Sequence, residues 1–203
     1  MPNRAEDQSS HGRPGRPRDP QTGEAILAAT TELLREVGYR DLTMEGVARR
    51  AGVAKTTVYR RWESKSLLVF EAVFTRTESE PPPNTGTFEG DLRVMIARLV
   101  EEFSTPEAVA TIPGLLADFG GDPMLRAQIQ DRFLPPARDY WAGMLTEAID
   151  RGEVRGDATV DASFHVLNGA VFSRIVLGGE IADQAFADEL AELVLSGLTL
   201  SGA

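Results

Sequence analysis

The sequence predicts an all-α protein with about nine helices, divided into a small N-terminal helical domain and a larger C-terminal one. Apolar residues recur at helical spacing through most of the chain beyond Glu24, and no segment shows the alternation and turn signals of hairpin strands. A break at Pro81-Pro82-Pro83 separates the two helical regions. These two patterns together favour a helical assembly over any sheet-based fold.

The N-terminal region predicts four helices after a polar tail. Residues 1–20 are rich in Pro, Gly, Ser and Arg, and such a segment buries too little apolar surface to offset its ordering entropy. Gly38 and Gly52 are stop signals, whereas Thr43 and Ser64 are candidate N-caps. The four helices are expected over residues 24–37, 43–50, 55–62 and 64–74.

The C-terminal region predicts five longer helices. They are expected over residues 88–103, 107–119, 123–151, 161–176 and 183–200. Pro135-Pro136 falls inside the third of these, where proline removes a backbone hydrogen bond and clashes with the preceding turn. We therefore expect a kink there, which would open space beside the neighbouring helices.

Composition excludes several classes of function. Apolar residues make up 42% and charged residues 26% of the 203 residues, as in an ordinary globular protein, and no apolar run is long enough to cross a bilayer. No secretion leader is recognisable, so we expect a cytoplasmic protein with no membrane partner. The absence of cysteine excludes thiolate zinc sites, and His11 and His165 lie far apart, so we expect no metal and no cofactor.

Three positions indicate a helix-turn-helix. Ala48 supplies the small residue where two helices touch, Gly52 the tight turn and Val58 the apolar anchor of the second helix. That second helix would lie in the major groove of DNA. Its expected exposed side chains can bond phosphates or base edges; they are Lys55, Thr56, Thr57, Tyr59, Arg60 and Arg61. The alternative is an amphipathic helix whose polar face is merely solvated.

The charge distribution agrees with an anionic partner for the N-terminal end. Residues 1–65 carry 12 Lys and Arg against 9 Asp and Glu, whereas the remaining residues carry 9 against 22. A basic end on an acidic body suits a protein that presents one end to a polyanion. For the acidic part alone, a solvated surface that needs no partner is the favoured explanation.

Residues 24–70 resemble the DNA-binding region of the TetR family of bacterial regulators. The matching motifs are Gly38-Tyr39, Leu42-Thr43-Met44, Val47-Ala48, Ala51-Gly52-Val53 and the run from Thr57 to Lys65. The resemblance implies that Thr43 and Lys65 hold phosphates, that Lys55 and Thr57 face bases, and that Tyr59 and Arg60 contact backbone or base. Ala54 departs from the family, since a capping serine is frequent there.

The resemblance also implies how the chain is divided. A basic tail (1–20) would precede a helix-turn-helix domain (21–67) and a ligand-binding and dimerisation domain (68–203). In the tail, Gly12 to Arg18 resembles the core of an AT-hook, so Arg13 and Arg16 are candidates for a narrow minor groove. A solvated basic tail with weak phosphate attraction is the alternative.

In this family, large side chains of the C-terminal domain line a cavity, and simple core packing is the alternative for each residue. The candidates are Met95, Leu99, Phe103, Leu116, Phe119, Phe133, Trp141, Leu145 and Phe172, together with the polar His165 and Asn168. The last two helices carry apolar stripes that would pair two copies of the chain. One stripe is Val166, Ala170, Ser173 and Leu177, and the other is Leu190, Leu193, Val194, Gly197 and Leu198. Packing of both stripes within one chain stays open.

These observations predict a homodimeric transcription regulator, a repressor that a small, largely apolar effector releases from a palindromic double-stranded operator. One alternative is a ligand-independent architectural DNA-binding protein. The other is an all-α enzyme, but with no cysteine and no nucleophile motif around Ser163 the catalytic inventory is poor, so we expect no enzyme activity.

Overall fold

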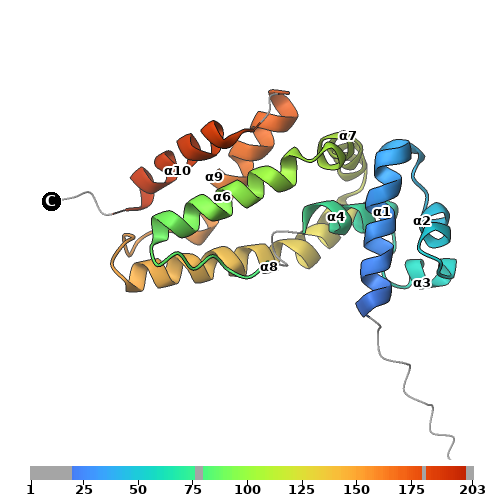
Figure 1. The fold of residues 1–203 in the computed structure, drawn as a ribbon, viewed down its shortest axis with the longest axis horizontal. Helices are drawn as coiled ribbons and strands as arrows, with labels where there is room; N and C mark the ends of the chain where they lie inside the picture. The colour runs from blue at the N-terminus through green and yellow to red at the C-terminus, as the bar shows by residue number, and fades with distance from the viewer. Residues whose placement is uncertain (1–19, 76–79, 180–181, 200–203) are drawn as a thin grey trace, which may run out of the picture.

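The computed structural model describes residues 20–75, 80–179 and 182–199, and within these ranges it contains nine α-helices and one π-helical turn (Figure 1). The helices are α1 (Pro20–Asp41), α2 (Met44–Arg50), α3 (Lys55–Tyr59), α4 (Lys65–Phe74), α6 (Phe88–Ser104), α7 (Pro106–Gly121), α8 (Pro123–Asp150), α9 (Val160–Phe172), the π turn η1 (Ser173–Leu177) and α10 (Gln184–Leu198). The all-α prediction is confirmed. Across the described ranges, the β pairing is limited to an isolated antiparallel bridge between Val154 and Thr199.

Side-chain caps fix most helix starts where the sequence predicted them. Thr43 accepts the Gly46 N–H at 3.1 Å and Ser64 accepts the Leu67 N–H at 3.2 Å. Gly38 and Gly52 have φ angles of 72° and 68°, a left-handed conformation that favours glycine. Helical residues continue to Asp41 after the non-helical Gly38, so this glycine kinks the end of α1 rather than ending it.

Two predicted helices have different ends in the structure, and α1 runs from Pro20 to Asp41 instead of over residues 24–37. The helix α3 ends at Tyr59 instead of Trp62, and its N-cap Ala54 forms no side-chain cap bond. Pro135-Pro136 was expected to kink the long helix, yet α8 runs through both prolines without a break. Both prolines are exposed, so their rings point away from the packed face of α8.

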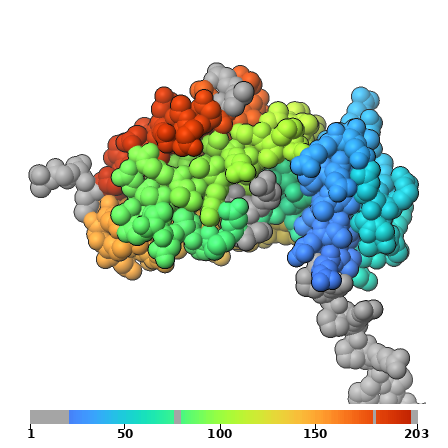
Figure 2. All heavy atoms as spheres, in the orientation of Figure 1, coloured from blue at the N-terminus to red at the C-terminus, as the bar shows by residue number. Residues whose placement is uncertain are grey.

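The helices form two apolar cores that meet at α4 and α8. One core joins α1–α4 to α7 and to the first half of α8, and the other joins α6, α9, α10 and the second half of α8. In Figures 1 and 2, α1–α3 project as a lobe at one end of the elongated bundle. The core of this lobe therefore extends beyond the helix-turn-helix segment into α7 and α8.

A buried tyrosine joins α1, α4 and α7. The Tyr39 hydroxyl donates to Asp118 Oδ2 at 2.5 Å and lies 2.9 Å from Ser66 Oγ, which itself donates to Asp118 at 2.6 Å. Burial, and then the hydrogen bond to Asp118, raise the pKa of Tyr39 above its usual range. Arg35 on α1 also pairs with the buried Glu107 on α7. These contacts hold the lobe against the bundle.

Within the described residues, no helix is long and apolar enough to cross a membrane. Residues 1–19 of the predicted tail, with Arg13 and Arg16, lie outside the described residues, and Pro20 begins α1.

Gly114→Ala tests the close approach of α7 to Tyr39. A Cβ at Gly114 would lie 2.2 Å from Tyr39 Cδ1, so we expect the free energy of unfolding to fall by about 1–3 kcal/mol. The matched control is Gly143→Ala on α8, where a Cβ meets nothing within 4 Å; helix propensity should there stabilise the protein by up to about 1 kcal/mol. Urea denaturation measures both, and equal effects would contradict the account.

Candidate nucleic-acid interface and buried cavity

The helix-turn-helix has the geometry that the Ala-Gly-Val spacing predicts. Ala48 and Val58 are buried, and the Val53 N–H donates to the Ala48 carbonyl at 3.0 Å across the Gly52 turn. Arg50 at the end of α2 donates to Glu36 at 2.8 Å and to Glu32 at 3.2 Å on α1. The two short helices are therefore fixed by backbone geometry, apolar anchors and one ion-pair cluster.

The outer face of α3 presents the side chains that the sequence identified. Lys55, Thr56, Tyr59 and Arg60 are exposed, and Thr57 is half-buried. Arg61 differs, because its guanidinium lies against Gly23 at the start of α1 and near the Trp62 ring. Trp62 is buried, and its indole N–H donates to Glu71 at 2.8 Å. The exposed set combines phosphate-binding cations with groups that can reach base edges.

A carboxylate occupies part of this face. Glu45 on α2 pairs with Lys55 and accepts a hydrogen bond from the Tyr59 hydroxyl at 3.4 Å. The Lys55 ammonium lowers the pKa of Glu45, and Glu45 in turn raises the pKa of Lys55. Sequence reasoning missed Glu45, because acidic residues in the first turn of a helix are ordinary.

The two predicted phosphate-binding residues lie in different surroundings. Thr43 is exposed, and its hydroxyl caps α2. Lys65 is half-buried, donates to the Tyr39 carbonyl at 2.9 Å and lies 4.3 Å from the centre of the Tyr39 ring. Lys65 also donates to the Arg40 carbonyl at 3.4 Å, and it thus stabilises the C-terminal end of α1.

A cavity of about 120 Å³ lies where α4, α6, α8 and α9 meet. It is lined by Phe70, Phe74, Met95, Leu99, Glu102, Phe103, Phe133, Leu134, Ala137, Tyr140, Trp141, Phe164, Leu167 and Asn168. Six of the predicted residues are among them: Met95, Leu99, Phe103, Phe133, Trp141 and Asn168.

The structure places the other five candidates elsewhere, which corrects the sequence-based prediction. Leu116 is 41% exposed on α7, and Phe119 packs against the core of the lobe. Leu145 is buried one turn beyond Trp141, in the C-terminal core. His165 is exposed beside Asp161, because Phe164, Leu167 and Val171 define the inner face of α9, and Phe172 is half-buried at its end.

Aromatic rings form a continuous row along the cavity. Ring centres are 5.0 Å apart for Phe133 and Phe70, 5.4 Å for Phe70 and Phe74, and 5.2 Å for Phe74 and Phe103. This row crosses from α8 through α4 to α6. Sequence reasoning missed Phe70 and Phe74, although their spacing of four residues puts them on one face of α4.

A few polar groups accompany the apolar lining. Arg98 donates to the Tyr140 hydroxyl at 3.2 Å, and burial raises the pKa of Tyr140. The Asn168 amide donates to the Phe164 carbonyl at 2.9 Å, and the Trp141 indole donates to Ser163 at 2.7 Å. Glu102 is a buried carboxylate in the lining. The cavity is thus mainly apolar, with aromatic side chains as half of its lining and polar groups at several points of its wall.

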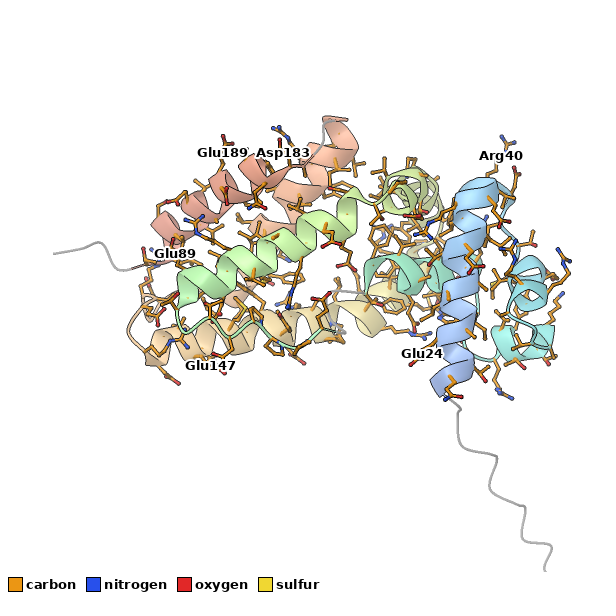
Figure 3. The ribbon with its side chains drawn as sticks, in the orientation of Figure 1. Glu24, Arg40, Glu89, Glu147, Asp183 and Glu189 are labelled. Atoms are coloured by element: carbon orange, nitrogen blue, oxygen red, sulfur yellow. The ribbon has the colours of Figure 1, made fainter. Side chains whose placement is uncertain are left out.

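Charge differs between the two ends of the molecule. Glu89, Glu147, Asp183 and Glu189 lie on the helical bundle in Figure 3, far from α2 and α3. The cations Lys55 and Arg60 are on the lobe. Throughout the described ranges, no group of three or more His, Cys, Asp or Glu residues could hold a metal ion.

Comparison with known proteins identifies the two regions. Residues 26–72 match the family "Bacterial regulatory proteins, tetR family", and residues 82–194 match "Tetracyclin repressor-like, C-terminal domain". The uncharacterized HTH-type transcriptional regulator YdeS of Bacillus subtilis (strain 168) is 30% identical over 190 residues, which cover 93% of this chain and 96% of that protein. The DNA-binding transcriptional repressor TetR of Mycobacteroides abscessus is 29% identical over 181 residues, 88% of this chain and 94% of its own.

Solved structures share the fold. The TetR family transcription regulator SCO0332 is 28% identical, with a TM-score of 0.74 over 89% of this chain and 100% of its own. FadR from Bacillus subtilis, solved in complex with stearoyl-CoA, is 21% identical, with a TM-score of 0.64 over 86% of this chain and 98% of its own; at this identity it shows the fold alone. This chain belongs to the TetR family of bacterial DNA-binding transcriptional regulators.

Proposed function

We propose that this regulator is a homodimeric repressor that binds a palindromic operator through α3 and leaves it when a small, largely apolar effector enters the cavity. The observation that carries this proposal is that α4 packs against the lobe that bears α3 and also lines the cavity. Ser66 in its first turn belongs to the Tyr39 cluster beneath the lobe, and Phe70 and Phe74 line the cavity. A displacement of α4 therefore affects both ends.

The small cavity gives an effector a way to move α4. An apolar protein cavity of about 150 Å³ accommodates benzene, so at about 120 Å³ this cavity is too small for even a single ring unless its lining moves. A larger effector must push the lining helices apart. FadR, which has the same fold, was solved with stearoyl-CoA, so the fold accommodates large ligands. A ligand-independent architectural protein predicts a fully packed C-terminal core, which this cavity does not favour.

Pairing through the last helices supplies the two-fold symmetry of a palindrome. Val166, Leu177 and Leu193 are 50%, 76% and 65% exposed on α9, η1 and α10. The predicted stripe on α10 needs correction, because Leu190, Val194 and Leu198 are buried within this chain. We propose that the exposed residues of α9, η1 and α10 form the dimer contact.

Selection from randomised duplex DNA tests the proposed function. The proposal predicts an enriched palindrome whose half-sites lie about 34–36 Å apart, or a multiple of this spacing. Absence of any enriched palindrome at low salt would contradict it.

Glu45→Gln should tighten DNA binding. Removal of the carboxylate frees Lys55 and Tyr59 for phosphates, so we expect about 2–5-fold tighter binding at low salt. The plot of log Kd against log salt should also steepen by about 1.8, the value of one additional phosphate contact in each half-site of the palindrome. Fluorescence anisotropy with the selected duplex measures both quantities. The control is Glu189→Gln, the same charge change on α10 (Figure 3); an equal gain in both variants would refute a local role for Glu45.

Phe103→Ala should weaken effector binding by about 10-fold or more, because a buried aromatic side chain contributes roughly 1.5–3 kcal/mol. The ligand is a compound selected for releasing the operator, and its binding is followed by Trp141 emission in a Trp62→Phe background, where Trp141 is the remaining tryptophan. Leu116→Ala, outside the cavity, should leave the affinity unchanged. Equal losses in both variants would place the ligand elsewhere.

A further inference from the structure

The helix α8 consists of two halves that pack in different cores. Its first half contributes Leu125, Ile129 and Phe133 to the core of the lobe. Its second half contributes Trp141, Met144, Leu145 and Ala148 to the core of the bundle. Pro135-Pro136 lies between these halves, and the cavity lies at the same level, lined by Phe133 and Leu134 on one side and Ala137 and Trp141 on the other.

The two prolines make this point the easiest place for α8 to bend. Proline has no backbone N–H, so Pro135 and Pro136 cannot donate to the carbonyls of Asp131 and Arg132 one turn earlier. Two consecutive helical hydrogen bonds are therefore missing between the halves. The sequence led us to expect a static kink, whereas the continuous helix has a weak point beside the cavity.

The first half of α8 holds the segment that follows the recognition helix α3. Arg132 Nη1 donates to the Arg61 carbonyl at 3.1 Å, and Arg132 Nη2 donates to Glu71 Oε2 at 2.7 Å. The same Glu71 oxygen accepts the Trp62 indole N–H at 2.8 Å. One turn earlier on α8, Gln128 donates to Glu63 at 2.8 Å.

Arg132 is well suited to this link. Its guanidinium presents several donors in a planar fork, so it bonds a backbone carbonyl and a carboxylate at once. It also stacks near Phe133, with 5.1 Å between the guanidinium carbon and the ring centre. Phe133 lines the cavity, so neighbouring side chains on α8 touch the cavity and the end of the DNA-binding unit.

We propose that Arg132 is a positioning residue that transmits occupancy of the cavity to α3, with Pro135-Pro136 as the hinge. This inference rests on the proposed function, in which α3 binds the operator and the cavity takes the effector. An occupied cavity displaces the first half of α8 about the prolines. Arg132 then shifts the Arg61–Glu63 segment, and with it the angle of α3.

A double-mutant cycle tests this role without an identified effector. Leu99→Phe places a ring in the cavity from α6 and leaves Arg132 and both prolines unchanged, so it serves as built-in occupancy. Operator Kd is measured for the unmodified protein, Leu99→Phe, Arg132→Gln and the double variant. The control is Arg138→Gln, beyond the hinge on α8, whose guanidinium pairs with Asp161 at 2.8 Å in the bundle. Thermal unfolding confirms that each variant is folded.

We expect Leu99→Phe to weaken operator binding about tenfold in the unmodified protein and with Arg138→Gln, but less than about threefold with Arg132→Gln. An equal loss in all three backgrounds would overturn the role of Arg132 and leave the proposed function standing. If Leu99→Phe changes nothing in any background, the cavity and the operator are not linked, and both proposals fail. A tenfold loss from Arg132→Gln alone would make Arg132 a structural support of DNA binding and also overturn its transmitting role.

The hinge is tested separately by Pro135→Ala/Pro136→Ala. Both prolines are exposed, so the substitutions restore two helical donors without changing either core. The stiffer helix should reduce the effect of Leu99→Phe to less than about threefold and raise the unfolding temperature. An undiminished effect in a folded double variant would overturn the hinge.

Discussion

The packing of α4 between two apolar cores is the constraint on which the rest of the structure depends. Leu67, Leu68, Val69 and Val73 bury one side of α4 in the core of the lobe, and Phe70 and Phe74 continue the aromatic row into the bundle. Protein interiors are close-packed, so such side chains cannot move independently of their neighbours. A ligand that displaces Phe70 or Phe74 must therefore move α4, and the lobe moves with it.

The proposed DNA-binding face is built differently. Its side chains are exposed, and the contacts between Glu45, Lys55 and Tyr59 are of the kind that contribute little to folding. Lys55 and Tyr59 can therefore exchange the Glu45 carboxylate for a DNA phosphate. The side chains behind α3 are rigidly packed, whereas the charged groups on its outer face can exchange partners. This combination suits a protein in which one ligand changes the binding free energy of another by about 1–3 kcal/mol, the usual range for linked sites.

Local chemistry explains why much of this architecture was predictable. Thr43, Ser64, Gly38 and Gly52 carry cap and turn signals that act within a few residues, and the spacing of Ala48, Gly52 and Val58 specifies the helix-turn-helix. The cavity was harder to predict, because helical periodicity separates inner from outer faces but does not say which inner residues surround a void. Leu145 and Phe103 are both apolar residues at helical spacing, yet Leu145 lies in the packed core and Phe103 lines the cavity. The tertiary contacts of Arg132 and Asp118 with the lobe have no sequence signal at all.

The central claim is that the cavity and the DNA-binding face are joined through α4 and α8. Hydrogen–deuterium exchange of the protein with and without its selected operator duplex tests this most directly, because linkage is reciprocal. The account predicts that operator binding changes amide protection in α4 and around Pro135-Pro136 of α8, as well as in α2 and α3. Changes confined to α1–α3, with α4 and α8 unaltered, would contradict it.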